Sequence, residues 1–346
     1  MENTNAPAVS VVIPMYNAEK YIGECLDSLL NQTFKNFEVI IVNDCSSDNS
    51  CAVVESYVKS FGGRLRILGN KQNSGAAASR NNGLMISRGE YIFFMDSDDL
   101  LMLDGLERMH KTAEEFDADA IDLSRFYKMR DDAKEIKTVN YKYERVFFDG
   151  LKEIFVDDDL AWRMKKPMTW RFFSVPWLRF FKRDFLIKNK LFFPENVTRC
   201  EDVVWKYGFL FLAKRIVHVS YITYFYRISS ASLSRQKRTH AEYVNSRMTT
   251  IIDGIKWIDD VMNRVEFFQK NPHRRYEIFE EFMSNMFERL LIQTQKKKVA
   301  AVEIFEAVKE GFGEKLGRHN VLVAELCSLI DDQNKEISKL QERLKG

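Results

Sequence analysis

The chain has 346 residues, of which 45% are hydrophobic and 29% are charged, a size that fits one large domain with an appendage or two modest domains. Its formal net charge of +2 gives no reason to expect a nucleic-acid partner. Five scattered cysteines without a CxxC pair argue against both a disulfide framework and a zinc site.

The N-terminal segment does not have the charged and then apolar layout of a signal peptide. No apolar run in the sequence approaches the roughly 20 residues that span a bilayer. Scattered cysteines also suit a reducing compartment. We therefore expect a cytoplasmic protein.

Strands and helices alternate through the first hundred residues. Residues 9–14 are a β-branched run that ends in proline, which predicts a buried strand, and residues 18–32 carry apolar side chains at helical spacing. Further strands are predicted at 37–42, 65–68 and 91–95, and further helices at 50–61 and 76–86. This alternation predicts a doubly wound parallel sheet.

The pattern changes after residue 105. A helix is predicted at 106–116, a strand at 120–128, an edge hairpin within 134–146, a helix at 203–213 and extended segments within 216–226. Beyond His240 the chain is expected to be all-helical, because an apolar stripe runs from Val244 to Val265 and Pro272 opens another helix.

Polar side chains follow three of the predicted strands at the point where each ends. Tyr16 and Asn17 follow the first strand, Asp44 the second, and residues 96–99 the fourth. Because ligands of such sheets bind beyond the carboxyl ends of the strands, we expect these side chains to converge on one crevice. Neither GxGxxG nor a P-loop motif occurs, which disfavours a dinucleotide dehydrogenase and a P-loop ATPase.

The triplet Asp96-Ser97-Asp98 is the most informative of these clusters. Two carboxylates just past a strand end can both approach Mg²⁺ or Mn²⁺, which bind oxygen ligands and commonly link protein carboxylates to substrate phosphates. Such an ion would neutralise the charge of a diphosphate leaving group. The alternative is a solvated turn that caps a helix starting near Asp99 or Leu100.

Three other side chains have both a functional and a structural interpretation. Asp44 can accept the imide N–H of uracil or form an Asx turn. Tyr16 can stack on a base or pack against the sheet edge. Arg80 can contact phosphate or base, or it can be a surface charge on its helix.

Taken together, these residues resemble the family 2 glycosyltransferases with the GT-A fold. The matching segments are residues 11–17, 28–34, 37–48, 73–83 and 89–99, in the family's order and spacing. The resemblance implies a Rossmann-like α/β fold, with a mostly parallel sheet flanked by helices and a C-terminal all-helical extension. It implies a nucleotide-sugar-binding half at 1–105, an acceptor-binding half at 106–238 and the helical extension at 239–346.

The resemblance also implies roles for individual residues. Asp98 would bind Mn²⁺ or Mg²⁺ directly, and Asp96 would lie near the ribose and the metal ion. Asp202, in the pair Glu201-Asp202, would be the general base, although this pair can also be a helix N-terminus favoured by the macrodipole. The remaining implied substrate contacts are Pro14, Tyr16, Asn17, Asp44, Arg80, Ser97, Glu201, and Arg227 with Ser229 or Ser232.

These roles predict an inverting, metal-dependent transferase that moves a hexose or N-acetylhexosamine from a UDP-sugar to a saccharide or lipid-linked saccharide. Inverting transfer needs a base that takes the proton of the acceptor hydroxyl. Two alternatives stay open: a catalytically silent sugar-nucleotide-binding or scaffold protein on the same fold, and a sugar nucleotidyltransferase. The second would want a Gly-rich basic loop, which residues 14–20 lack.

The stretch from Trp162 to Phe193 mixes aromatic and basic residues. This composition suits a peripheral membrane contact at the inner face of the membrane. It also suits packing of Trp170, Phe172, Phe173 and Trp177 into the acceptor half, which we favour. The C-terminal helices are expected either to form a homo-oligomer or to place the acceptor.

Overall fold

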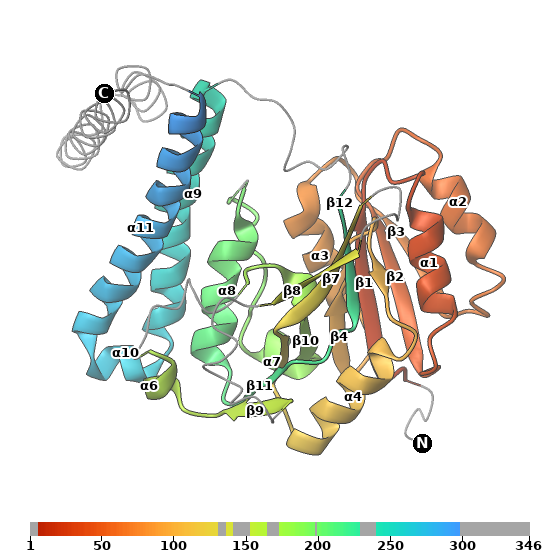
Figure 1. Cartoon of the computed structure of the whole chain (residues 1–346), viewed down its shortest axis with the longest axis horizontal. Helices are drawn as coiled ribbons and strands as arrows, with labels where there is room; N and C mark the ends of the chain where they lie inside the picture. Colours follow the sequence, from red (N-terminus) through yellow and green to blue (C-terminus); the bar gives the residue numbers. More distant parts are fainter. Residues whose placement is uncertain are drawn as a thin grey trace, which may run out of the picture.

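The structure, a computed structural model, describes residues 6–130, 136–140, 153–164, 173–197, 199–228 and 240–297. The first hundred residues contain four parallel strands: β1 (Val9–Met15), β2 (Phe37–Asn43), β3 (Leu65–Gly69) and β4 (Tyr91–Phe94). They lie side by side in the order β3-β2-β1-β4 (Figure 1). The predicted parallel sheet is confirmed.

Helices cover both faces of these strands. α1 (Ile22–Leu30) and α2 (Ser50–Tyr57) lie on one face, and α3 (Gly75–Ile86) lies on the other (Figure 1). Side chains of β1 alternate between the faces: Val11 belongs to the buried cluster of α1, whereas Val12 belongs to the buried cluster of α3. α1 is shorter than predicted because residues 18–21 form a turn before it.

The other half of this sheet comes from later parts of the chain. Its strands are β6 (Ala120–Leu123), β9 (Ile154–Asp157), β10 (Arg179–Lys182) and β11 (Ile216–Val219). The complete order is β3-β2-β1-β4-β10-β6-β11-β9, with β10 antiparallel to both of its neighbours. The sequence did not predict β9 or β10. In β10 only Phe180 and Phe181 are apolar, and basic residues flank them, so the run is too short to indicate a strand.

A second sheet has four strands: β5 (Leu100–Leu101), β7 (Arg125–Arg130), β8 (Ile136–Asn140) and β12 (Tyr224–Ile228). Their order is β5-β12-β7-β8. The predicted strand at 120–128 is divided at Ser124, where the chain passes from the large sheet into the small one. The interpretation of Asp99 as a helix cap is wrong, because β5 follows it and α4 (Gly105–Phe116) begins later.

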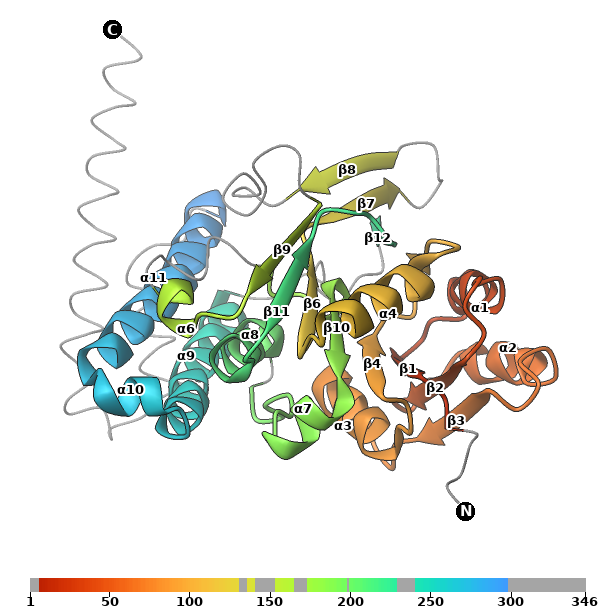
Figure 2. The same cartoon turned by 90° about the horizontal axis from the view of Figure 1, so that it is seen from below.

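The C-terminal extension is helical, as predicted, over its described residues 240–297. It contains α9 (His240–Asn263), α10 (Glu266–Lys270) and α11 (Pro272–Lys297), and α8 (Glu201–Leu212) precedes it. α9 packs against both α8 and α11 (Figure 2). Ile251, Ile258 and Met262 of the predicted stripe are buried in the shared core. At Gly208 a Cβ would lie 2.6 Å from the ring of Trp257, so glycine permits this close approach.

The segment from Trp162 to Phe193 packs into the protein where it is described. It includes the end of α6 (Leu160–Arg163), a 3-10 turn at Pro176–Leu178, and α7 (Arg183–Lys188). Trp177 is buried and Phe173 packs against the same core, which confirms the packing interpretation for these two rings. Trp170 and Phe172 lie outside the described residues. Of the helices in the described ranges, none combines the length and the apolar character that crossing a bilayer requires.

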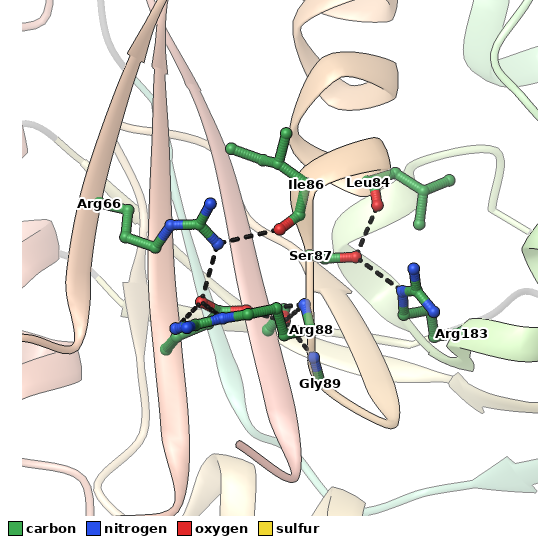
Figure 3. Close-up of polar contacts among 9 residues, drawn as sticks. Arg66, Leu84, Ile86, Ser87, Arg88, Gly89 and Arg183 are labelled. Atoms are coloured by element: carbon green, nitrogen blue, oxygen red, sulfur yellow. Dashed lines mark hydrogen bonds and ion pairs between the residues drawn. The ribbon is translucent and has the colours of Figure 1, made fainter. Parts of the chain in front are cut away.

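Glu38 anchors the turn between α3 and β4 at the sheet edge where the parallel strands begin. Its buried carboxylate accepts hydrogen bonds from Ser10 Oγ and from the backbone and guanidinium of Arg88, each at 2.8 Å, and from Arg66 at 3.2 Å (Figure 3). At Gly89 a Cβ would lie 2.4 Å from the backbone nitrogen of Ser10, so no side chain fits. This anchor fixes the start of β4 and therefore the position of the acidic residues that follow it.

Five fully buried charged or titratable side chains join the strands of the later half. Asp157 accepts from Arg163 Nε at 2.9 Å, and Asp122 lies 2.8 Å from Arg179 Nη2 and 3.0 Å from His218 Nδ1. Burial lowers the pKa of His218, but hydrogen bonds with Asp122 and Asp157 outweigh it and raise the pKa. Because a buried ion that loses its counter-charge is costly, these five residues must stay together.

Replacing Asp157 with Asn should lower the free energy of unfolding by about 3–5 kcal/mol, because the change leaves Arg163 buried without its counter-charge. Asp158 is exposed next to it. Asp158→Asn should change the unfolding free energy by less than about 0.5 kcal/mol. Urea unfolding followed by circular dichroism measures both variants. Equal stability of the two would contradict the role of the buried cluster.

Candidate active site

The carboxyl ends of the parallel strands bring the predicted polar residues to one edge of the sheet. β1 lies between β2 and β4, with Met15 opposite Asn43. The backbone N–H of Asp44 donates to the carbonyl of Met15 at 2.8 Å, which joins the two strand ends. Asp44 and residues 96–99 therefore leave the same edge, as the sequence predicts.

Asp44 is 4% exposed and binds the first turn of α3. Its Oδ1 accepts from Asn70 Nδ2 and from the N–H of Ser74, both at 2.8 Å, and its Oδ2 accepts from the N–H of Gly75 at 2.7 Å. Within this loop, Asn43 Oδ1 accepts from the N–H of Ser46, three residues on, at 3.0 Å. A carboxylate has about four acceptor sites, so Asp44 retains capacity for one further donor.

Residues 14–17 lie at the end of β1 beside Asp44. Pro14 is half-buried in the strand. Tyr16 is 43% exposed, so its ring does not pack into the sheet edge. Asn17 has φ of 49°, in the left-handed region, and its Oδ1 accepts from the N–H of Ser47 at 2.8 Å. Asn17 thus joins the loop after β1 to the loop after β2. The neighbouring Tyr16 ring stays exposed.

Arg80 is 6% exposed, so the interpretation as a surface charge is wrong. Its Nη2 donates to Asp96 at 2.9 Å, its Nη1 donates to Glu201 at 3.4 Å, and its guanidinium lies over the ring of Phe193. Burial lowers the pKa of Arg80, but Asp96 and Glu201 raise it further, so the group stays charged. Its buried Nε has no hydrogen-bond partner among the described residues.

The pair Glu201-Asp202 forms the first turn of α8, as predicted. Cys200 precedes it with φ of 57°, a strained conformation that turns the chain into the helix. Burial and the neighbouring Asp202 raise the pKa of Glu201 to about 7. The Oδ1 of Asp202 accepts from the N–H of Val203 at 2.8 Å. Arg80 therefore connects this helix start to the acidic residues after β4.

The segment that precedes α8 is held by Asn81, the neighbour of Arg80 on α3. Asn81 Oδ1 accepts from the N–H of Phe193 at 2.8 Å, and its Nδ2 donates to the carbonyl of Phe193 and to Glu195. Asn81 thus recognises the backbone in the way a strand neighbour would. Asn81 lies in the family segment 73–83, but no role was predicted for it from the sequence.

Asp99 and Tyr224, for which no role was predicted from the sequence, hold the acidic segment after β4. The buried carboxylate of Asp99 accepts from Tyr224 Oη and from the backbone N–H of Arg227, both at 2.7 Å. Arg227 Nε donates to the carbonyl of Asp98 at 2.8 Å, and its Nη2 donates to Glu24 at 2.6 Å. The available signal was the third carboxylate of the run, placed directly before the apolar pair that forms β5.

The carboxylates of Asp96, Asp98 and Asp99 lie close together after β4. Burial, followed by Asp98 and Asp96, raises the pKa of Asp99 well above its usual value. Burial and the same carboxylates raise the pKa of the Cys25 thiol, whose Sγ lies 3.8 Å from the carbonyl of Asp96. A divalent cation would relieve this repulsion, since hard cations take carboxylate oxygens as ligands.

No group of three or more His, Cys, Asp or Glu side chains among the described residues is arranged to hold a metal ion. Mg²⁺ and Mn²⁺ need only one or two protein carboxylates when substrate phosphates and water complete the coordination. Asp98 and Asp96 fit that donor set, whereas the carboxylate of Asp99 is taken up by Tyr224 and Arg227. Ser97 lies half-buried between the two aspartates, and Ser232 lies outside the described residues.

Comparisons with known proteins agree with this geometry. The family model described as glycosyl transferase family 2 matches residues 10–175. Glycosyltransferase GlyG of Streptococcus pneumoniae serotype 4 is 30% identical over 66% of this chain and 73% of GlyG. TarP of Staphylococcus aureus, a poly(ribitol-phosphate) beta-N-acetylglucosaminyltransferase, is 27% identical over 84% of this chain and 82% of TarP.

A solved structure shows the same fold. The crystal structure of S. aureus TarS in complex with UDP superposes with a TM-score of 0.60 and 22% identity, and the match covers 93% of this chain and 88% of that one. The expected GT-A-like architecture, a mostly parallel sheet flanked by helices, is thereby confirmed. Motifs, curated relatives and fold agree, and the chain belongs to the family 2 glycosyltransferases and is a glycosyltransferase.

Proposed function

We propose that the protein is an inverting, metal-dependent transferase that moves a hexose or N-acetylhexosamine from a UDP-sugar to a saccharide or lipid-linked saccharide. One observation carries the proposal. The buried guanidinium of Arg80 binds Asp96 after β4 and Glu201 at the start of α8. A diphosphate bound at Asp96 and Asp98 would therefore lie near Asp202, with only the Arg80 side chain between them.

The nucleoside binds at the ends of β1 and β2. Asp44 retains acceptor capacity for the imide N–H of uracil, and the exposed ring of Tyr16 lies beside it to stack on the base. Pro14 completes this side of the pocket. The complex of TarS with UDP supports a uridine nucleotide, because that protein shares the fold of this chain.

The diphosphate binds next to the acidic residues. Asp98 holds Mn²⁺ or Mg²⁺, with Asp96 as a second ligand, and such an ion neutralises charge on the leaving diphosphate. Arg80 contributes fixed positive charge, and its Nη2 lies 2.9 Å from Asp96. Arg227 reaches the carbonyl of Asp98 and is therefore placed to contact the diphosphate as well.

Asp202 acts as the general base. The oxygen of the acceptor hydroxyl attacks the anomeric carbon, the bond from that carbon to the UDP oxygen breaks, and the hydroxyl proton passes to Asp202. Attack opposite the leaving diphosphate inverts the configuration. Asp202 lies in the first turn of α8, where its Oδ1 accepts from the N–H of Val203 at 2.8 Å. Glu201, with a pKa of about 7, positions Arg80 instead.

UDP should bind about 10- to 100-fold more tightly than CDP, because the ring nitrogen of cytosine cannot donate the hydrogen bond that Asp44 accepts. Titration calorimetry with each nucleotide in the presence of Mg²⁺ measures these affinities. Equal affinity for UDP and CDP would rule out the contact between Asp44 and uracil.

Asp98→Ala should lower Mn²⁺- or Mg²⁺-dependent turnover of the UDP-sugar by at least about 100-fold, because the metal ion supplies several kcal/mol of charge stabilisation. Asp104→Ala is the matched control, since this half-buried aspartate makes no side-chain cap bond at the start of α4. Release of UDP measures the activity, and circular dichroism checks the fold. Unchanged turnover in Asp98→Ala would refute the metal assignment.

Asp202→Asn should bind UDP as the unchanged protein does but lose transfer by about 10²- to 10⁴-fold, because an amide cannot take the acceptor proton. The exposed Asp184, on α7, provides the control variant Asp184→Asn, which should transfer normally. Single-turnover UDP release with donor prebound separates binding from chemistry. A near-normal rate in Asp202→Asn would remove this residue from the base role.

A further inference from the structure

One row of side chains crosses all four strands of the small sheet. Leu100 of β5 lies opposite Phe225 of β12, Phe225 lies opposite Tyr127 of β7, and Tyr127 lies opposite Thr138 of β8. Residues directly opposite each other in a sheet share a face, so these four side chains form a single row on one face. Adjacent strands are about 4.8 Å apart, so the row is about 14 Å long.

The two aromatic residues of this row stack on each other. The ring centroids of Tyr127 and Phe225 are 5.0 Å apart with an interplanar angle of 30°. Both side chains, and that of Leu100, are half-buried rather than buried, and Thr138 is exposed. The row therefore presents an accessible aromatic surface. An aromatic pair of this kind can also simply stabilise the sheet, so its position decides whether it has a further role.

The opposite face of the same strands is core. Tyr224 and Tyr226 stack on the buried Trp177 with ring centroids 4.5 and 5.4 Å away, and Phe126 packs edge-on to the same ring. Aromatic residues thus alternate along β12, and those needed for packing point to one side. Phe225 points to the other side, where the core makes no demand for an aromatic ring.

The row begins at the candidate active site and leads away from it. Leu100 directly follows the acidic residues 96–99, and Arg227 lies two residues from Phe225 on the same face of β12. Arg227 donates to the carbonyl of Asp98 at 2.8 Å, which connects this face to the site of the diphosphate. At its far end the row reaches the exposed Thr138 on the edge strand β8.

We infer that this row is the docking surface for the acceptor, and that Tyr127 and Phe225 stack on its pyranose ring. The inference rests on the proposed transfer to a saccharide. Axial C–H groups of a pyranose carry partial positive charge, and aromatic faces carry the complementary negative charge. The acceptor, not the donor sugar, fits a row that runs outward, because the donor sugar is held at the diphosphate whereas an acceptor chain extends away from it.

Tyr127→Leu and Phe225→Leu keep an apolar cross-strand contact and remove the aromatic face. Each should weaken contact with methyl pyranosides of glucose, galactose and N-acetylglucosamine about 2- to 10-fold and leave UDP affinity unchanged. Saturation-transfer NMR with UDP and Mg²⁺ present measures the saccharide, and calorimetry measures UDP. Tyr127→Phe should retain the saccharide contact. Ile67→Ala, at an exposed position of β3 in the large sheet, is the matched control.

The two arms separate the inference from the proposed function. A protein that does not bind UDP would contradict the proposed function. The inference would be overturned if the protein bound UDP but showed no pyranoside contact. It would also be overturned if the two leucine variants contacted the pyranosides as strongly as the unchanged protein does. If ribitol, which has no ring, contacted the row as strongly as the pyranosides do, ring stacking would also be overturned. The inference would also be overturned if the leucine variants lost UDP-sugar hydrolysis without acceptor as much as they lost pyranoside contact, because the row would then hold the donor sugar.

Discussion

The candidate site depends on the burial of one guanidinium between three parts of the chain. Arg80 comes from α3, Asp96 follows β4, and Glu201 begins α8. Arginine keeps its charge inside a protein, so it can hold two carboxylates that would otherwise repel each other. The ring of Phe193 beneath it excludes water, which strengthens both ion pairs. The segment after β4 and the start of α8 therefore meet at a fixed separation.

The charge balance around this guanidinium explains what the site is prepared to bind. Asp96, Glu201 and Asp202 lie near it, and burial together with neighbouring carboxylates raises the pKa values of Asp99 and Glu201. Hydrogen bonds from Tyr224 and Arg227 hold Asp99 in place despite that repulsion. Carboxylates held close together are ligands that a divalent cation would take, and such an ion would in turn bind a diphosphate.

The sequence predicted those parts of the molecule whose signals are local. The four parallel strands follow from short apolar runs, and Asp44 and Asp98 follow from their places at strand ends. β10 could not be predicted, because its pairing with β4 and β6 comes from distant contacts and its apolar core is two residues long. Asp99 and Tyr224 were missed for the same reason: their hydrogen bond joins segments 125 residues apart.

Successive side chains of strand β12 have different roles, so the register of the strand must be kept. Tyr224 holds Asp99, Phe225 faces outward, and Arg227 reaches Asp98. A slip of one residue would exchange the two faces of the strand. Insertion or deletion of a single residue in the connection at 220–223 would therefore turn the aromatic surface inward and release the acidic loop. The length of this short connection is therefore constrained.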